Sequence, residues 1–206
     1  MELVLASNNP HKVTEVRRIL VGVAVRTPAE VGVSFAFEET GSTYEQNALG
    51  KARHLHGLIG MPTLADDSGL AVAALGGAPG VRSARFGPPG AALDDAGRCA
   101  YLLSLLHGAA AADRSAAFIC CIAVVLDARR LLLVQEAVAG RIAPQPRGAR
   151  GFGYDPVFLV RAGDAGDAGE RTMAELTAAD KDRLSHRGRA LRRIAALLAC
   201  PTPPPS

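Results

Sequence analysis

The chain opens with the pattern of a strand, a tight turn and a helix, and this order constrains the fold more than any other feature. Residues 3–6 form a short apolar run, as expected of a buried strand, and residues 7–9 are polar. Pro10 suits the first position of a helix, and Asn8 or Asn9 would cap it. The apolar face of that helix carries Val13, Val16, Ile19 and Leu20. A strand that runs directly into a helix predicts the α/β class.

Later segments alternate between the same two kinds of element. The turn Asp127-Ala128-Arg129-Arg130 separates two strand-like runs and predicts a β-hairpin. The sheet is therefore expected to be mixed rather than purely parallel. Helical patterns cover residues 44–58, 94–106 and 186–199, and strand-like runs cover residues 116–126, 131–139 and 154–160.

Composition favours a compact globular protein. Of 206 residues, 49% are hydrophobic and 21% are charged, so the chain can bury a core as one large domain or two closely integrated lobes. A net charge of +3 is too small for a general nucleic-acid coat. Residues 1–7 lack the pattern of a signal peptide, and no apolar run is long enough to span a bilayer.

The cysteines favour a reducing compartment. They are scattered and have no paired metal-ligand spacing, and two of them sit inside an apolar run like buried small hydrophobes. A cytoplasmic location is the expectation. The four are Cys99, Cys120, Cys121 and Cys200.

The segment Asp66-Asp67-Ser68-Gly69 carries the strongest chemical signal. Two adjacent carboxylates beside apolar runs are costly unless they face water, a cation or hydrogen-bond donors. Carboxylate oxygens are the ligands that Mg²⁺ prefers, and hydrolysis of a metal-bound substrate needs a nearby base. The alternative is a simple turn, because Asp, Ser and Gly are common turn formers.

Three further groups add to this signal, although each has a purely structural reading. Glu38-Glu39-Thr40-Gly41 supplies more carboxylates or is a solvated acidic turn, and Gly151-Phe152-Gly153-Tyr154-Asp155-Pro156 offers a ring to a flat base or is only a glycine loop. Ser185-His186-Arg187-Gly188 follows Lys181, and together they either supply cations for a substrate or are only the basic start of a helix. Glu45, just after Ser42-Thr43-Tyr44, is equally well explained by a capping box. Together these groups provide what a nucleoside triphosphate requires.

The start of the first helix is also suited to phosphate binding. Lys12 lies in the first turn of the first helix, where free backbone N–H groups and an ammonium make a ready anion site. The chain lacks a Walker A sequence, which disfavours a P-loop NTPase.

At these residues the chain resembles the inosine/xanthosine triphosphate pyrophosphatases, which remove non-standard purines from the nucleotide pool. The resemblance extends from Leu3 to about Leu198. Five segments match in order, namely residues 5–12, residues 38–48, residues 65–85 in three blocks, residues 151–156 and residues 185–188. The Maf-type nucleotide pyrophosphatases share a similar opening but lack the Ser-His-Arg ending, and a non-catalytic nucleotide-binding module is the alternative from another class.

The resemblance implies a role for each matching residue. Asp67 matches the proton acceptor and a Mg²⁺ contact, and Glu38 matches a metal-associated glutamate, with Glu39 leaving a one-residue ambiguity. The implied substrate-binding residues are Ser7, Asn8, Asn9, Pro10, His11, Lys12, Ser68, Phe152, Gly153, Tyr154, Asp155, Lys181, His186 and Arg187.

The resemblance also implies a fold and a reaction. We expect an elongated mixed sheet with flanking helices and two lobes around a substrate cleft, as one domain over residues 1–199 that forms a homodimer. Residues 200–206 are predicted to be a Pro-rich disordered tail, and residues 162–170 a mobile loop. The expected reaction is Mg²⁺-dependent hydrolysis of ITP, dITP and XTP to the monophosphate and pyrophosphate. Selectivity over ATP would come from hydrogen-bond donors facing the 6-keto oxygen.

Overall fold

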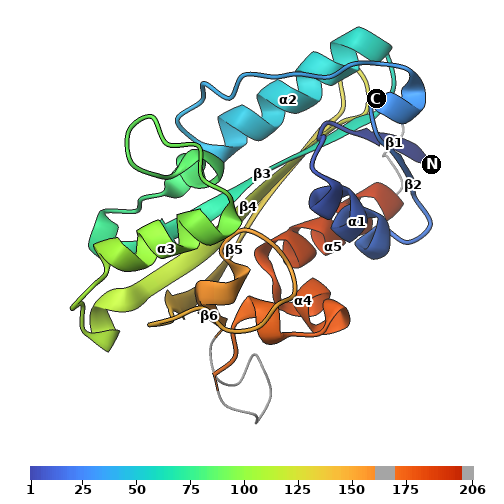
Figure 1. Cartoon of the computed structure of the whole chain (residues 1–206). Coiled ribbons are helices and arrows are strands. Elements are labelled where there is room, and N and C mark those ends of the chain that lie inside the picture. The colour runs from blue at the N-terminus through green and yellow to red at the C-terminus, as the bar shows by residue number, and fades with distance from the viewer. Residues whose placement is uncertain (161–169, 201–206) are drawn as a thin grey trace. The chain divides into compact units, whose positions relative to one another are not determined.

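The computed structural model describes residues 1–160 and 170–200. It begins with β1 (Glu2–Leu5) and α1 (Pro10–Ile19), drawn in blue in Figure 1. The Asn9 side chain caps α1 by accepting from the backbone N–H groups of His11, at 2.9 Å, and Lys12, at 3.3 Å. The strand, turn and capped helix predicted from the sequence are therefore confirmed.

A six-stranded sheet with flanking helices confirms the mixed α/β class. Its strand order is β2-β1-β3-β4-β5-β6. β1 pairs in parallel with β2 (Ala24–Arg26) and β3 (Thr63–Val72), with Leu3 opposite Val25 and Leu5 opposite Leu64. At the other edge β6 (Phe158–Val160) runs antiparallel to β5 (Leu131–Ile142). β4 (Ser115–Val125) lies between β3 and β5 and meets β5 through the predicted turn.

Three further helices fall close to the predicted ranges, namely α2 (Tyr44–Ile59), α3 (Asp95–Leu105) and α5 (His186–Ala199). The short helix α4 (Ala178–Leu184) was not predicted. Short 3-10 helices cover Ala29–Val31, Ala73–Leu75, Gly80–Arg85, Ala111–Arg114, Asp155–Val157 and Met173–Glu175. Over the described ranges, no helix has both the length and the apolar character needed to cross a bilayer.

The chain forms two compact units, and three strands contribute to both. Of the described residues, the first unit contains Met1–Asp67, Cys121–Glu136 and residues 187–200. The second contains Ser68–Cys120 and Ala137–His186. Leu3, Leu5, Val16, Leu55 and Leu64 are buried in the first unit. The core of the second includes Leu70, Leu102, Phe118, Tyr154, Phe158 and Met173.

Three local interpretations are corrected. Asp66-Asp67-Ser68-Gly69 is not a turn, because β3 continues through it as a buried strand. The cap of α2 uses Thr43, which accepts from the Gln46 N–H at 3.1 Å, while the Gln46 side chain accepts from the Ser42 N–H at 2.9 Å. Glu45 therefore has no part in that cap.

The strand predicted over residues 154–160 begins only at Phe158. Asp155 and Pro156 start a 3-10 turn, since the Asp155 carboxylate accepts from the Phe152 N–H at 2.8 Å and Pro156 has a fixed φ suited to a first helical position. The predicted loop over residues 162–170 lies outside the described residues except for Glu170, and the predicted tail lies outside them except for Cys200.

Candidate active site

The two adjacent aspartates of β3 lie inside the first unit and serve two separate clusters. Successive residues of a strand point to opposite faces, so Asp66 and Asp67 meet different partners. Their exposed fractions are 1% and 4%. Two carboxylates buried this deeply require cations or hydrogen-bond donors on both faces.

Asp66 is held by two cations. Arg187 at the start of α5 donates from Nε to Oδ2 at 2.8 Å and from Nη2 to Oδ1 at 3.3 Å, a bidentate pairing. The Lys12 ammonium also pairs with Asp66 Oδ1. Burial alone raises the pKa of Asp66, but Arg187 and Lys12 outweigh it and hold the pKa well below its usual range. Asp66 is therefore a fixed negative charge.

Arg187 is balanced by a second carboxylate as well. Its Nη1 donates to Glu15 Oε2 on α1 at 2.7 Å, and α1 and α5 lie side by side in Figure 1. Arg187 is only 3% exposed. A buried guanidinium between two carboxylates holds the strand and the two helices together, and its charge is neutralised within the protein.

Asp67 lies among donors from α2. Lys51 Nζ donates to Oδ1 at 2.9 Å, and Asn47 Nδ2 donates to Oδ2 at 3.3 Å. Burial raises the pKa of Asp67 to about 6, Lys51 opposes this, and the nearby Glu39 carboxylate adds to it. Burial, together with the negative charge of Asp67, raises the pKa of Tyr44 to about 12. Asp67 is thus ionised at neutral pH, and its pKa is close enough to neutrality for it to accept a proton.

Glu39, rather than Glu38, joins this cluster. Lys51 Nζ lies 2.5 Å from Glu39 Oε1, so a single ammonium bridges Glu39 and Asp67. Lys51 outweighs the effect of burial and lowers the pKa of Glu39. Glu38 is exposed. Where the chain is described, no group of three or more His, Cys, Asp or Glu side chains is gathered around one point as a metal site.

The donor set nevertheless fits a hard cation bound together with a substrate. Mg²⁺ is commonly held by one or two carboxylates, with water and substrate phosphate supplying the other ligands. Asp67 and Glu39 provide two carboxylates already brought together by Lys51. A closed cage of protein ligands is not needed for that kind of site.

The turn between β1 and α1 is shaped by its own side chains. Ser7 Oγ accepts from the Asn9 N–H at 3.2 Å, and Asn8 Nδ2 donates to the Phe35 carbonyl at 2.8 Å. Lys12 reaches from α1 to Asp66, and 17% of its side chain remains exposed. Pro10 and His11 are exposed on the first turn of α1.

In the second unit, Asp155 organises the loop that carries Phe152. Asp155 is 3% exposed, and its Oδ2 accepts from the Phe152 N–H at 2.8 Å and from Lys181 Nζ at 2.5 Å. The Lys181 ammonium lies 4.8 Å from the centre of the Phe152 ring. Gly151 has a φ of +77°, and a Cβ there would overlap Asp155 Oδ2. Lys181 is therefore fixed by a buried carboxylate beside an aromatic face.

Two groups on α3 hold the next residue of that loop. Asp95 Oδ2 accepts from the Gly153 N–H at 2.7 Å, and Cys99 Sγ donates to the Gly153 carbonyl at 3.3 Å. Tyr154 donates its hydroxyl to the Ser83 carbonyl at 2.9 Å. The N–H groups of Phe152 and Gly153 are therefore already bonded to carboxylates.

His186 and Ser68 complete the sequence-predicted residues of this unit. The His186 ring stacks on Phe118 with centroids 4.7 Å apart and planes 12° from parallel, and only 6% of His186 is exposed. Ser68 is half-buried at the position after Asp67 in β3. The structure thus gathers Lys12, Asp66, Asp67 and Arg187 in the first unit, and Phe152, Asp155 and Lys181 in the second.

Sequence reasoning missed four residues of these clusters: Glu15, Asn47, Lys51 and Asp95. Asn47 and Lys51 are four residues apart on α2, and this spacing places them on one helix face. That polar pair on a helix with buried Ala48, Ala52 and Leu55 was the signal available for them. Glu15 and Asp95 gave no such signal, because they meet their partners only through tertiary contacts.

Comparison with known proteins identifies a family that matches almost the whole chain. The sequence model described as the Ham1 family matches residues 3–197. A protein of Treponema denticola named dITP/XTP pyrophosphatase is 43% identical over 196 residues, covering 95% of this chain and 97% of that protein. A Bacillus subtilis protein of the same name is 42% identical over 199 residues, covering 96% of each chain.

The fold is similar to that of solved relatives too. The structure of a HAM1 protein from Coxiella burnetii superposes with a TM-score of 0.82 at 42% identity, covering 96% of this chain and 98% of that one. A structure from Mycobacterium abscessus, described as a nucleoside-triphosphatase and dITP/XTP pyrophosphatase, gives a TM-score of 0.73 at 42% identity. That comparison covers 97% of this chain and 100% of the other.

Proposed function

This chain belongs to the Ham1 family, and on that premise we propose that it hydrolyses dITP, XTP and ITP to the nucleoside monophosphate and pyrophosphate. It is a nucleoside-triphosphate pyrophosphatase that clears non-standard purines from the nucleotide pool. The observation that best supports this reaction is the raised pKa of Asp67. Burial raises the pKa of this carboxylate, which lies beside a lysine and an asparagine, to about 6.

Asp67 is the proposed general base. Water attacks the α-phosphorus, its proton passes to Asp67, and the bond between the α-phosphorus and the bridging oxygen to the β-phosphate breaks as pyrophosphate leaves. A base with a pKa near 6 is ionised at neutral pH and still accepts a proton more readily than a free aspartate, whose pKa is about 3.9. Asn47 and Lys51 support this role because they fix the carboxylate by one bond to each oxygen.

Mg²⁺ is the proposed metal, with Asp67 and one glutamate as its protein contacts. Glu39 is the better supported glutamate, since Lys51 joins it to Asp67 while Glu38 is exposed. When bound, the metal neutralises phosphate charge and lowers the pKa of water. Lys12 and the amino end of α1 are proposed to bind phosphate oxygens, supported by the partly exposed Lys12 side chain.

The residues proposed to contact the purine ring are Phe152, Lys181 and His186. The other residues proposed to shape the substrate-binding segments are Ser7–Pro10, His11, Ser68, Gly153, Tyr154 and Asp155. The Phe152 ring offers a stacking face beside the Lys181 ammonium. Because the Phe152 and Gly153 N–H groups are already bonded, we assign recognition of the 6-keto oxygen to His186 rather than to those two groups. Arg187 is assigned to positioning Asp66, since two carboxylates neutralise it.

Two further properties belong to this proposal. The family resemblance supports a homodimer. The four cysteines, all within the described residues, form no disulfide and three of them are buried, which supports a reducing cytoplasm.

Pyrophosphate release from a panel of dITP, XTP, ITP, GTP and ATP tests the function. We expect kcat/KM for the first three to exceed that for ATP by about 10²–10⁵-fold, because a donor facing a keto oxygen is left unpaired against adenine's amino group. Asp67→Asn keeps the shape of the side chain and should lower turnover by about 10²–10⁴-fold. A nucleotide-binding module without catalysis would bind these nucleotides and release no pyrophosphate, and equal rates for ATP and ITP would contradict the proposed selectivity.

A further inference from the structure

The second unit contains an arginine-lined pocket of about 410 Å³ that none of the proposed catalytic or substrate-binding residues lines. Its charged lining consists of Arg114, Arg141, Arg147 and Glu170. A volume in this range suits a small organic ligand. The remaining lining is mainly apolar, with Ala109, Ile142, Pro144 and Leu159.

The positive charge in this lining exceeds the negative charge. Among the described residues, three guanidinium groups line the pocket with one carboxylate, and Glu175 outside the pocket pairs with Arg147 at 3.1 Å. The guanidinium of Arg114 is held by backbone carbonyls: its Nη1 donates to Ala143 O at 3.1 Å and its Nη2 to Leu106 O at 2.9 Å. Those carbonyls fix the group in place without neutralising its charge.

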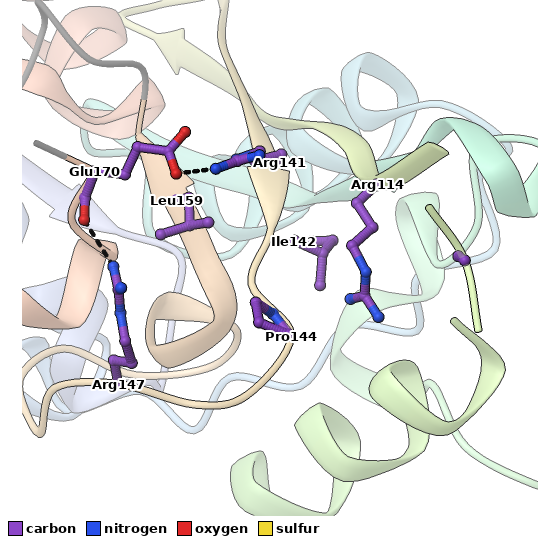
Figure 2. A pocket seen from close by; sticks show the side chains of 8 residues that line it. Arg114, Arg141, Ile142, Pro144, Arg147, Leu159 and Glu170 are labelled. Carbon is purple, nitrogen blue, oxygen red and sulfur yellow. Dashed lines mark hydrogen bonds and ion pairs between the residues drawn. The ribbon is translucent and has the colours of Figure 1, made fainter. Parts of the chain in front are cut away.

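Glu170 acts as an internal anion in the pocket. Figure 2 shows its carboxylate joined to Arg141, its carbonyl joined to Arg147 and Arg114 standing beyond Ile142. The side chains of Arg141 and Glu170 are 40% and 39% exposed. A half-exposed ion pair of this kind contributes little to stability, so an incoming anion can compete for Arg141 at small cost.

The arginines also have unused hydrogen-bonding capacity. Within residues 1–160 and 170–200, the Nε atoms of Arg141 and Arg147 are buried and have no hydrogen-bond partner. Unsatisfied donors in a native site are costly, and a small rotation of either guanidinium that brings Nε to an acceptor removes that cost. An anion with several oxygens supplies such acceptors.

We propose that this pocket binds a small organic phosphate, with the phosphate group on Arg141 in place of the Glu170 carboxylate, Arg114 adding its charge, and the organic part against Ile142, Pro144 and Leu159. A phosphate monoester carries close to two negative charges at neutral pH. Once it displaces Glu170, two guanidinium groups, those of Arg114 and Arg141, have no carboxylate partner among the described residues, so a dianion matches them better than a carboxylate or sulfonate does. Guanidinium groups bind phosphate oxygens in pairs, which gives the site its geometric preference. The proposal is independent of the catalytic assignment, since none of these residues is placed in the reaction.

Isothermal titration calorimetry of the full chain with phenyl phosphate, without added divalent cation, tests this site. Benzenesulfonate has the same ring and only one negative charge, and serves as the matched probe. We expect saturable binding of phenyl phosphate with a Kd of about 1 mM or tighter, and binding of benzenesulfonate at least about tenfold weaker.

Variants with opposite expected effects locate the binding. Arg114→Gln and, as a second variant that leaves the Leu106 and Ala143 contacts intact, Arg141→Gln should each weaken binding of phenyl phosphate by about tenfold. Glu170→Gln removes the competing carboxylate and should strengthen it by a few-fold, roughly 3-fold. All three variants should hydrolyse dITP at the wild-type rate. No saturable binding, or binding that all three variants leave unchanged, would overturn the proposal.

Discussion

At the scale of single residues, Asp66 and Asp67 differ because one strand turns them toward different partners. Asp66 is stabilised as an anion by Arg187 and Lys12, whereas burial and the neighbouring Glu39 leave Asp67 only partly compensated by Lys51. Removing the charge of each should therefore change stability in opposite directions. The pair forms a natural control, since the two side chains are identical and adjacent.

Asp66→Asn should destabilise the metal-free protein and Asp67→Asn should stabilise it at pH 7.5. The first leaves Arg187 buried with one carboxylate fewer, a loss of about 3–5 kcal/mol. The second removes an ionised group whose pKa is raised from 3.8 to about 6, a gain of about 1–3 kcal/mol at 1.36 kcal/mol per unit. Thermal unfolding in EDTA measures both, at about 2–4 °C per kcal/mol for a chain of this size. Shifts of the same sign would contradict the assignment.

The stabilisation by Asp67→Asn should depend on pH in a defined window. The pKa of Asp67 in the folded state lies above its unfolded value, so folding binds a proton between pH 3.8 and about 6 and the wild type loses stability as the pH rises through that range. Below pH 3.8 the carboxyl is neutral in both states. The difference in Tm between the variant and the wild type should therefore be small near pH 4 and reach its full value by about pH 7. A difference that does not change with pH would argue against a raised pKa.

At the scale of elements, two neighbouring aspartates at the start of α3, Asp94 and Asp95, have different roles. Asp94 caps the helix by accepting from the Gly97 N–H at 2.7 Å, and Asp95 holds the Gly153 N–H of the Phe152 loop at 2.7 Å. The cap could be predicted from sequence, because an Asp before an apolar helical pattern is a standard start signal. The second contact could not, since Asp95 and Gly153 are 58 residues apart and nothing local marks them as partners.

Asp95→Ala should raise KM for dITP by about tenfold with little change in kcat, because it frees the loop that is proposed to bind the base without touching Asp67. Asp95→Asn retains an acceptor oxygen and should restore most of the affinity. Asp94→Ala is the matched control, expected to cost about 0.5–2 kcal/mol of stability through the lost cap while leaving KM unchanged. Steady-state kinetics with dITP measure all three. An equal rise in KM for both alanine variants would show that α3 acts only through its stability.

At the scale of the whole molecule, sequence periodicity was sufficient to predict most helices and strands. It was not sufficient to predict the charged clusters around Asp66 and Asp67. α1 followed from its apolar spacing and its cap, α2 from its apolar spacing alone, and the hairpin from its polar turn. β3 was harder, because Asp66 to Gly69 consists of turn formers, and only tertiary partners such as Arg187 and Lys51 keep that segment in a strand. Glu15 was missed for the same reason, since its partner Arg187 is 172 residues away in sequence. Lys51 had a local signal in its spacing from Asn47, but its charged partners Glu39 and Asp67 lie outside α2.

Removal of divalent cations with a chelator should affect the reaction but not the stability of the fold. Lysine and arginine side chains balance the buried carboxylates Asp66, Asp67 and Glu39. EDTA should therefore abolish turnover while changing Tm by less than about 2 °C, which corresponds to under 1 kcal/mol. Added Mg²⁺ should restore activity without a refolding step. Unfolding on chelation, followed by circular dichroism, would show that the metal is structural.

The Lys51 ammonium affects the state of the site when no substrate is bound. It bridges Glu39 and Asp67 as a counter-ion that belongs to the protein, and it thereby offsets the repulsion between the two carboxylates. The carboxylates are thus held in a ready arrangement while the site is idle. A metal–nucleotide complex that arrives meets a preassembled receptor, and little of its binding free energy is spent on rearranging the protein.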